Sequence, residues 1–115
     1  MASVEVSKEL ANNVYEIIET AKTTGKVIKG TNEATKAIEK GQAKLVVIAK
    51  DVSPPEIIMH IPLIAEEKDV PCFTVPSKEE LGAAVGIDVG TGSVVVTEEG
   101  EAKNLIRDIL TKAKQ

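Results

Sequence analysis

Leu45-Val46-Val47-Ile48-Ala49 is a continuous run of apolar residues, three of them β-branched. A strand with one face in water would alternate apolar and polar residues, so an unbroken run is typical of a strand that is buried on both faces. We therefore predict that this segment is the central strand of a sheet and that helices cover both faces of that sheet.

The sequence before this strand predicts two helices with a short strand between them. Ser7 caps the first helix and Gly25 ends it. Its apolar residues recur on one face: Leu10, Val14, Ile17, Ile18 and Ala21. Residues 26–29 form the short strand. Gly30 then allows a tight turn, Thr31 or Asn32 caps the second helix, and Gly41 ends that helix.

Helices and strands keep alternating after the central strand. The predicted order is a helix over 54–68, a strand over 72–75, a helix from Ser77 to Gly86, a strand over 93–97 and a helix over 101–114. Pro62 should interrupt the first of these helices near His60, because a proline inside a helix removes a hydrogen bond. The alternation predicts an α/β fold. We expect one domain, residues 1–115, built as a three-layer α/β/α sandwich on a mixed, mainly parallel sheet of about four strands.

The composition excludes several kinds of site. Tyr15 and Phe73 are the only aromatic residues, too few for a platform on which bases stack. Cys72 is the only cysteine and His60 the only histidine, so neither an intrachain disulfide nor a cysteine-based zinc site can form. No serine or cysteine has an evident base partner. We therefore expect a protein with no enzymatic activity, no catalytic residues, no metal and no cofactor.

The distribution of apolar residues bears on location and oligomeric state. No apolar run approaches the roughly 20 residues of a membrane span, and the start of the chain lacks the pattern of a secretory signal. We expect a cytoplasmic protein that makes no membrane contact. One core should need all of the apolar residues, so we expect a monomer when the protein is free.

Charge is unevenly distributed along the chain. Residues 22–50 hold seven lysines against Glu33 and Glu39, a balance of +5, whereas residues 51–101 have a balance of −9. An ordinary solvated surface could carry such charges. The basic third also contains the most informative polar segment, residues 29–36, with the sequence KGTNEATK.

The segment 29–36 places an amide, a carboxylate and an ammonium group on the first turns of one helix, at Asn32, Glu33 and Lys36. A carboxylate would repel phosphate but can accept hydrogen bonds from a guanine edge, so the combination favours base recognition. Lys26, Lys29 and Lys36 would supply phosphate contacts. In the plainer interpretation Gly30 makes a turn, Asn32 caps the helix and Lys36 is solvated.

The glycine-rich segment 86–92 allows three interpretations. It resembles weakly a phosphate loop, which would make the protein a small nucleotide-binding enzyme. It could instead present Ile87 and Val89 outward to cover an unstacked nucleotide. A plain turn between helix and strand that buries Ile87 is the third interpretation, and the sequence leaves all three open.

Motifs spread over most of the chain resemble one family. They are Gly30 to Ala37 with Gly41, the strand from Lys44 to Ala49, Pro55-Glu56-Ile57 with His60 and Pro62, Val70-Pro71, Ser77-Lys78, Leu81-Gly82, Ala84, and Gly86-Ile87. The chain resembles the kink-turn RNA-binding family of the archaeal large-subunit ribosomal protein L7Ae.

This resemblance implies a fold and a set of partners. The family folds as an α/β/α sandwich and binds the kink-turn, a sharply bent internal loop of RNA beside tandem sheared G·A pairs. The implied RNA partners are ribosomal RNA, the box C/D and H/ACA guide RNAs, and the RNA of ribonuclease P, which acts in tRNA processing. Other proteins of these particles are implied as partners too.

The resemblance also implies roles for individual residues. Asn32, Glu33 and Lys36 would contact the guanines of the sheared pairs, while Gly30 and Thr31 would bring backbone close to the RNA. The remaining implied RNA-binding residues are Lys26, Lys29 and Lys78 near phosphates, and Ile57, Ile87, Asp88 and Val89 around the flipped-out nucleotide. Lys50 and Ser53 depart from the family pattern, in which acidic residues are frequent at these positions, so an acidic acceptor for recognising that nucleotide is lost.

Overall fold

The structure is a computed structural model that describes residues 4–113. In chain order the elements are β1 (Val4–Glu5), α1 (Lys8–Thr24), β2 (Lys26–Lys29), α2 (Thr31–Glu39), β3 (Leu45–Ala49), the 3₁₀ helix η1 (Pro55–Ile57), α3 (His60–Glu67), β4 (Cys72–Val75), α4 (Lys78–Ala84), β5 (Ser93–Glu98), the 3₁₀ helix η2 (Gly100–Ala102) and α5 (Lys103–Ala113). Lys114, the predicted end of the last helix, lies outside the described residues.

The five strands form one sheet in the order β1-β4-β3-β5-β2, with β3 at its centre as predicted. All five residues of β3 are buried. The two strands beside β3 run in opposite directions. Val47 pairs with Phe73 of the parallel strand β4 and with Val94 of the antiparallel strand β5. The mixed sheet of the prediction is thereby confirmed.

The predicted sheet differs in one detail: it has a fifth strand, β1, whose two residues are too few to leave a periodic signal. β5 runs antiparallel to both β3 and β2, so the other four strands run in one direction and the sheet is mainly parallel, as predicted. β5 is reversed because of the connection after β4: α4 has only seven residues, and residues 85–92 then return the chain to the edge where β4 ended.

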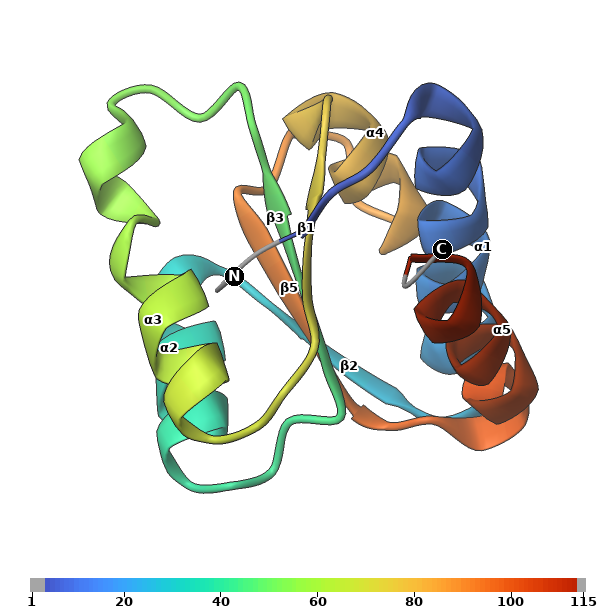
Figure 1. Cartoon of the computed structure of the whole chain (residues 1–115). Coiled ribbons are helices and arrows are strands. Elements are labelled where there is room, and N and C mark those ends of the chain that lie inside the picture. The colour runs from blue at the N-terminus through green and yellow to red at the C-terminus, as the bar shows by residue number, and fades with distance from the viewer. Residues whose placement is uncertain (1–3, 114–115) are drawn as a thin grey trace.

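Helices cover both faces of the sheet and so confirm the three-layer sandwich (Figure 1). Alternate residues of β3 point to opposite faces. Leu45, Val47 and Ala49 belong to the core beneath α1, α4 and α5. Val46 and Ile48 belong to the core beneath α2 and α3. No helix in residues 4–113 is long and apolar enough to cross a membrane.

Several predicted helix ends are confirmed by hydrogen bonds. Ser7 Oγ accepts from the backbone N–H of Leu10 at 3.3 Å, and Gly25 ends α1. Ser77 Oγ accepts from the N–H of Glu80 at 3.1 Å at the start of α4. These ends depend on side chains within four residues of the helix, so a local sequence pattern is enough to find them.

Two predicted helices differ in detail. The segment that begins at Pro54 is broken, as expected, but into η1 and a separate α3 that starts at His60, so Pro62 lies in the first turn of α3. A proline is tolerated there because first-turn N–H groups have no partner within the helix. The last helix begins at Lys103, after η2.

The ends of four strands meet at one edge of the sheet. β2, β3 and β4 finish there and β5 begins there. The backbone N–H of Gly30 donates to Ser93 O at 3.1 Å, that of Ala49 to Gly92 O at 2.9 Å, and that of Lys50 to Val75 O at 2.8 Å. We call this the carboxyl edge, defined by Gly30, Lys50, Val75 and Gly92. Loops in open α/β sheets carry their binding groups at such edges.

Candidate functional site

Gly30 begins α2 at the carboxyl edge without a side-chain cap. Its φ and ψ are 96° and 143°, and as the N-cap residue it makes no side-chain hydrogen bond to the first turn of the helix. The prediction that Thr31 or Asn32 would be the cap is therefore wrong. Only glycine adopts this backbone conformation easily, so the turn itself selects a residue that has no side chain to offer.

The space around Gly30 is open. A β-carbon built on this glycine would meet no other atom within 4 Å. The first N–H groups of a helix lack partners within the helix, and they carry the positive end of the helix dipole. The start of α2 can therefore accept a ligand that brings its own hydrogen-bond acceptors.

The start of α4 lies at the same edge but is closed. Besides the bond from Glu80 to Ser77, the N–H of Lys78 donates to Asp51 Oδ1 at 2.8 Å. Side chains of the protein thus accept hydrogen bonds from the N–H groups that start α4, whereas the N-cap residue of α2 provides no such acceptor. This difference singles out α2 as the place where an outside group can bind.

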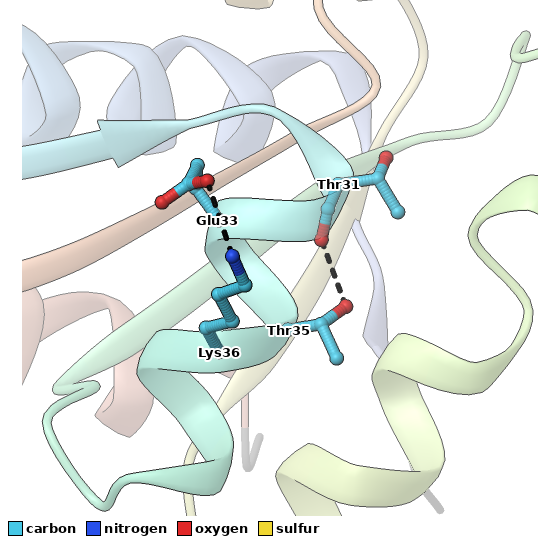
Figure 2. A network of polar contacts seen from close by, with 4 residues as sticks. All are labelled: Thr31, Glu33, Thr35 and Lys36. Atoms are coloured by element: carbon cyan, nitrogen blue, oxygen red, sulfur yellow. Dashed lines mark hydrogen bonds and ion pairs between the residues drawn. The ribbon is translucent and has the colours of Figure 1, made fainter.

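Glu33 and Lys36 stand together on the exposed side of the first turns of α2 (Figure 2). Glu33 Oε1 lies 3.8 Å from Lys36 Nζ, and each side chain is 64 % exposed. Asn32 is also exposed. An ion pair this exposed adds little to stability, so both partners can be redirected to a ligand at small cost.

The other side of the same turns is held to the rest of the protein. Thr31 Oγ1 lies 3.2 Å from Ser93 Oγ of β5. Thr35 Oγ1 donates to Thr31 O at 2.8 Å, as Figure 2 shows, and also lies 2.8 Å from His60 Nε2 of α3. The first turn of α2 is therefore bonded to the protein on the side that faces β5 and α3, and it is free on the side that carries Glu33 and Lys36.

Lys78, at the start of α4, forms hydrogen bonds with the loop after β3 and with the loop before β5. Its N–H donates to Asp51, and its carbonyl accepts from the N–H of Thr91 at 3.0 Å. Gly90 lies against the Lys78 side chain, where a β-carbon would come within 2.9 Å of Cγ. The half-buried Lys78 is thereby placed between the loop after β3 and the loop before β5.

The glycines of the segment 86–92 are occupied by the protein's own neighbouring groups. A β-carbon on Gly86 would overlap the Lys22 ammonium group, and one on Gly92 would come within 3.0 Å of Val52. A phosphate cradle needs the opposite, namely glycines whose backbone is open to the ligand. The contrast with the open Gly30 argues against the nucleotide-binding interpretation of this loop.

Of the two apolar residues in segment 86–92 that were predicted to point outward, only one is strongly exposed. Val89 is 69 % exposed, whereas Ile87 is half-buried and packs against the core beneath α1, α4 and α5. The backbone of Val89 sits on Gly82 of α4, where a β-carbon would overlap the Val89 carbonyl oxygen. Close packing of the loop on a glycine of α4 thus holds Val89 outward. Asp88 beside it is exposed.

Four large apolar side chains are exposed on the described residues, which corrects the expectation that one core needs them all. They are Ile57, Met59, Leu63 and Val89, with exposures from 48 to 69 %. Ile57 was predicted to contact the ligand, while Met59 and Leu63 were not singled out. The sequence pattern missed them because the break between η1 and α3 shifts which residues face the sheet.

Lys26 and Lys29 lie at opposite ends of β2. Lys29 precedes Gly30 at the carboxyl edge, but Lys26 pairs with Glu98 at the far end of β5. The two lysines are therefore about 10 Å apart along the strand. Lys26 instead lines an open groove of about 360 Å³, together with Gln42, Lys44 and others. The structure does not bring Lys26 together with the other predicted residues.

Sequence reasoning missed two polar contacts that shape the site. Asp51, which binds the N–H of Lys78, lies two residues after the central strand, a position that could have suggested a role at the carboxyl edge. The link between Thr35 and His60 joins residues 25 apart in sequence, and no local pattern announces it. Within residues 4–113, no three histidine, cysteine, aspartate or glutamate side chains gather as the ligands of a metal ion would.

Comparison with known proteins assigns the fold and the family. A solved structure, the "Giardia lamblia 15.5kD RNA binding protein", superposes with a TM-score of 0.89 at 31 % sequence identity, covering 95 % of this chain and 91 % of that one. The family model described as "Ribosomal protein L7Ae/L30e/S12e/Gadd45 family" matches residues 12–106. The chain belongs to the ribosomal protein L7Ae/L30e/S12e/Gadd45 family.

Proposed function

We propose that this protein binds RNA without catalysing a reaction, and that it selects and stabilises the kink-turn conformation. Membership of a ribosomal protein family and the similarity to a protein named as RNA-binding both support RNA as the ligand. The observation that carries the proposal is the open start of α2, where Gly30 leaves room for a partner and exposed polar side chains surround it.

Glu33 favours recognition of bases over phosphates at this site. Its carboxylate only accepts hydrogen bonds, and phosphate oxygens offer it no donor. The amino and imino groups of guanine do offer donors, and the Asn32 amide can both donate to and accept from a neighbouring base. Because Lys36 already lies 3.8 Å from Glu33, it would orient the carboxylate and balance its charge in the complex.

Lysines and apolar residues complete the proposed interface. Lys29, Lys36 and Lys78 would contact phosphates along the carboxyl edge, and Gly30 and Thr31 would allow close approach of the RNA backbone. Ile57 and Val89, both exposed, would pack against a nucleotide that has left the stack, with Ile87 and Asp88 beside Val89. We leave Lys26 out of this set because it lies at the far end of β2.

We propose that the whole chain, residues 1–115, acts as one such domain in ribonucleoprotein particles of the cytoplasm. The kink-turns of ribosomal RNA, of box C/D and H/ACA guide RNAs and of ribonuclease P RNA are the proposed ligands. Other proteins of these particles would bind next to the RNA. The free protein is proposed to be a monomer, and light scattering that showed a stable dimer at micromolar concentration would contradict this.

The proposal is tested with a kink-turn RNA that carries donor and acceptor dyes on its two stems. A protein that contacts only the bent form shifts the equilibrium toward it by the difference in its affinity for the two forms. Energy transfer should therefore rise during titration with the protein. A straight duplex of matched length and charge is the control, and equal affinity for both RNAs would refute the proposal.

A further inference from the structure

The first turn of α2 is held in place by groups outside the helix. A helix that starts at serine, threonine, aspartate or asparagine is pinned by its own cap, but Gly30 provides none. The holding groups are Ser93 of β5, which contacts Gly30 and Thr31, and His60 of α3, which contacts Thr35. Since these contacts lie on the side of the turn that faces β5 and α3, the side that carries Glu33 and Lys36 stays free for a ligand.

The direction of the contact between His60 and Thr35 follows from counting protons. A threonine hydroxyl has one proton, and that of Thr35 is donated to Thr31 O at 2.8 Å. Toward His60 Nε2, also 2.8 Å away, the same oxygen can therefore only accept. His60 must then donate from Nε2, which requires a ring that carries its proton on Nε2.

The chain of bonds from His60 through Thr35 to Thr31 connects the two halves of the proposed site. His60 is the first residue of α3 and follows the exposed Ile57 and Met59 by one to three positions. Thr31 stands next to Gly30 and Asn32 at the open helix start. A hydrogen bond between α3 and α2 at this point fixes the distance between the exposed apolar residues Ile57 and Met59 and the first turn of α2, which is proposed to contact bases.

We propose that His60 is a positioning residue for RNA binding. By donating a hydrogen bond to Thr35, it fixes the position of the first turn of α2 relative to η1 and α3. The expected effect on RNA affinity rests on the proposed function, whereas the hydrogen bond between His60 and Thr35 does not. His60 would act through Thr35 and would not have to touch the RNA.

A set of four variants tests the proposal. His60→Ala removes the donor, and His60→Gln keeps an N–H donor of similar reach. Thr35→Val removes the hydroxyl at constant shape, and Thr35→Ser keeps it. The loss of one hydrogen bond should lower kink-turn affinity about 2- to 12-fold in His60→Ala and Thr35→Val. His60→Gln and Thr35→Ser should restore most of it.

The double variant His60→Ala with Thr35→Val separates a linked pair from two independent effects. If His60 acts through Thr35, the double variant should bind little worse than Thr35→Val alone, because the bond can be lost only once. Glu66→Ala, an exposed change elsewhere on α3, is the matched control and should leave affinity unchanged. Additive losses in the double variant would overturn the proposal.

Nitrogen NMR of the free protein tests the bond without RNA. His60 is the only histidine, so its ring signals need no assignment among several. We expect Nε2 to carry a hydrogen-bonded proton, and Thr35→Val should make this proton exchange faster with solvent. A ring protonated on Nδ1 alone would overturn the inference. If the Nε2 proton is observed as expected but the wild-type protein does not bind kink-turn RNA, the hydrogen bond is confirmed and the proposed function is wrong.

Discussion

The backbone N–H of Lys78 donates to the carboxylate of Asp51 at 2.8 Å, across 27 positions of sequence. Lys78 begins α4, and Asp51 follows the central strand β3, so one bond joins two loops of the carboxyl edge. The carboxylate also lies at the positive end of the α4 dipole, where a negative charge is favourable. The contact serves both the stability of the fold and the placing of the Lys78 side chain.

Asp51→Ala should lower the free energy of unfolding by about 0.5 to 2 kcal/mol, the range found when a helix-capping acceptor is lost. Urea denaturation followed by circular dichroism measures the change. Asp51→Asn keeps an oxygen acceptor and should recover most of the loss. Asp88→Ala removes an exposed carboxylate from the same edge and should leave stability unchanged; equal losses for Asp51→Ala and Asp88→Ala would contradict the capping role.

Gly30→Ala and Gly41→Ala form a matched pair that separates backbone strain from RNA contact. Both glycines have positive φ, 96° and 74°, and neither would place a β-carbon within 4 Å of another atom. Each change should cost about 1 to 3 kcal/mol of stability through strain alone. Only Gly30→Ala should reduce kink-turn affinity as well, because its β-carbon would stand where RNA backbone approaches. A similar loss of affinity in both variants would contradict the placing of the site.

Glu33→Gln should weaken kink-turn binding by about 1 to 3 kcal/mol, because the new amide turns one acceptor into a donor that faces guanine donors. Simple electrostatics predicts the opposite sign, since the change removes a negative charge near RNA. Fluorescence anisotropy at fixed salt decides between the two. Glu39→Gln on the same helix is the control for charge alone and should bind slightly better. Tighter binding by Glu33→Gln would refute base reading by this residue.

Lys36→Ala should weaken binding and reduce the salt dependence of log affinity by about one unit, if the ammonium group meets a phosphate. Lys26→Ala removes the same charge from the far end of β2 and should change both quantities less. The comparison therefore tests position at constant chemistry. A larger effect of Lys26→Ala would show that the RNA follows β2 toward the groove lined by Lys26 and Lys44.

Tyr15 gives a pH measurement on a single group, because the chain has no other tyrosine and no tryptophan. Burial, and next the charge of Glu80, raise the pKa of Tyr15 above its ordinary value of 10.0, although a hydrogen bond with the Ser77 backbone works in the other direction. Ultraviolet titration of the folded protein should therefore show a midpoint above 10.0, which Glu80→Gln lowers.

The sign of the linked effect on stability follows from the proton count. As pH rises above the ordinary value of 10.0, the unfolded chain loses the Tyr15 proton before the folded protein does. The folded state then binds more protons, so the contribution of Tyr15 to stability is complete below that pH and falls until the folded protein has titrated. Urea midpoints measured across this range should fall faster in wild type than in Tyr15→Phe.

The sequence by itself determined the elements whose causes are local. The strands 26–29, 45–49 and 72–75 were predicted with the bounds that the structure has, because runs of β-branched and aromatic residues favour extended backbone over a few residues. Ser7 and Ser77 marked their helix starts because a cap needs only a side chain and an N–H group three residues later. Gly30 marked a turn, since its φ of 96° would strain any residue that has a side chain.

Only the tertiary structure decided how these elements meet. The pairing of the two-residue strand β1 and the antiparallel course of β5 depend on which edge a connection returns to, and that choice is made by packing of the whole chain. The contacts of Asp51 with Lys78 and of His60 with Thr35 join residues 27 and 25 positions apart. A local pattern cannot specify such pairs, because each partner is brought to the other only when the sheet and its two helical layers are assembled.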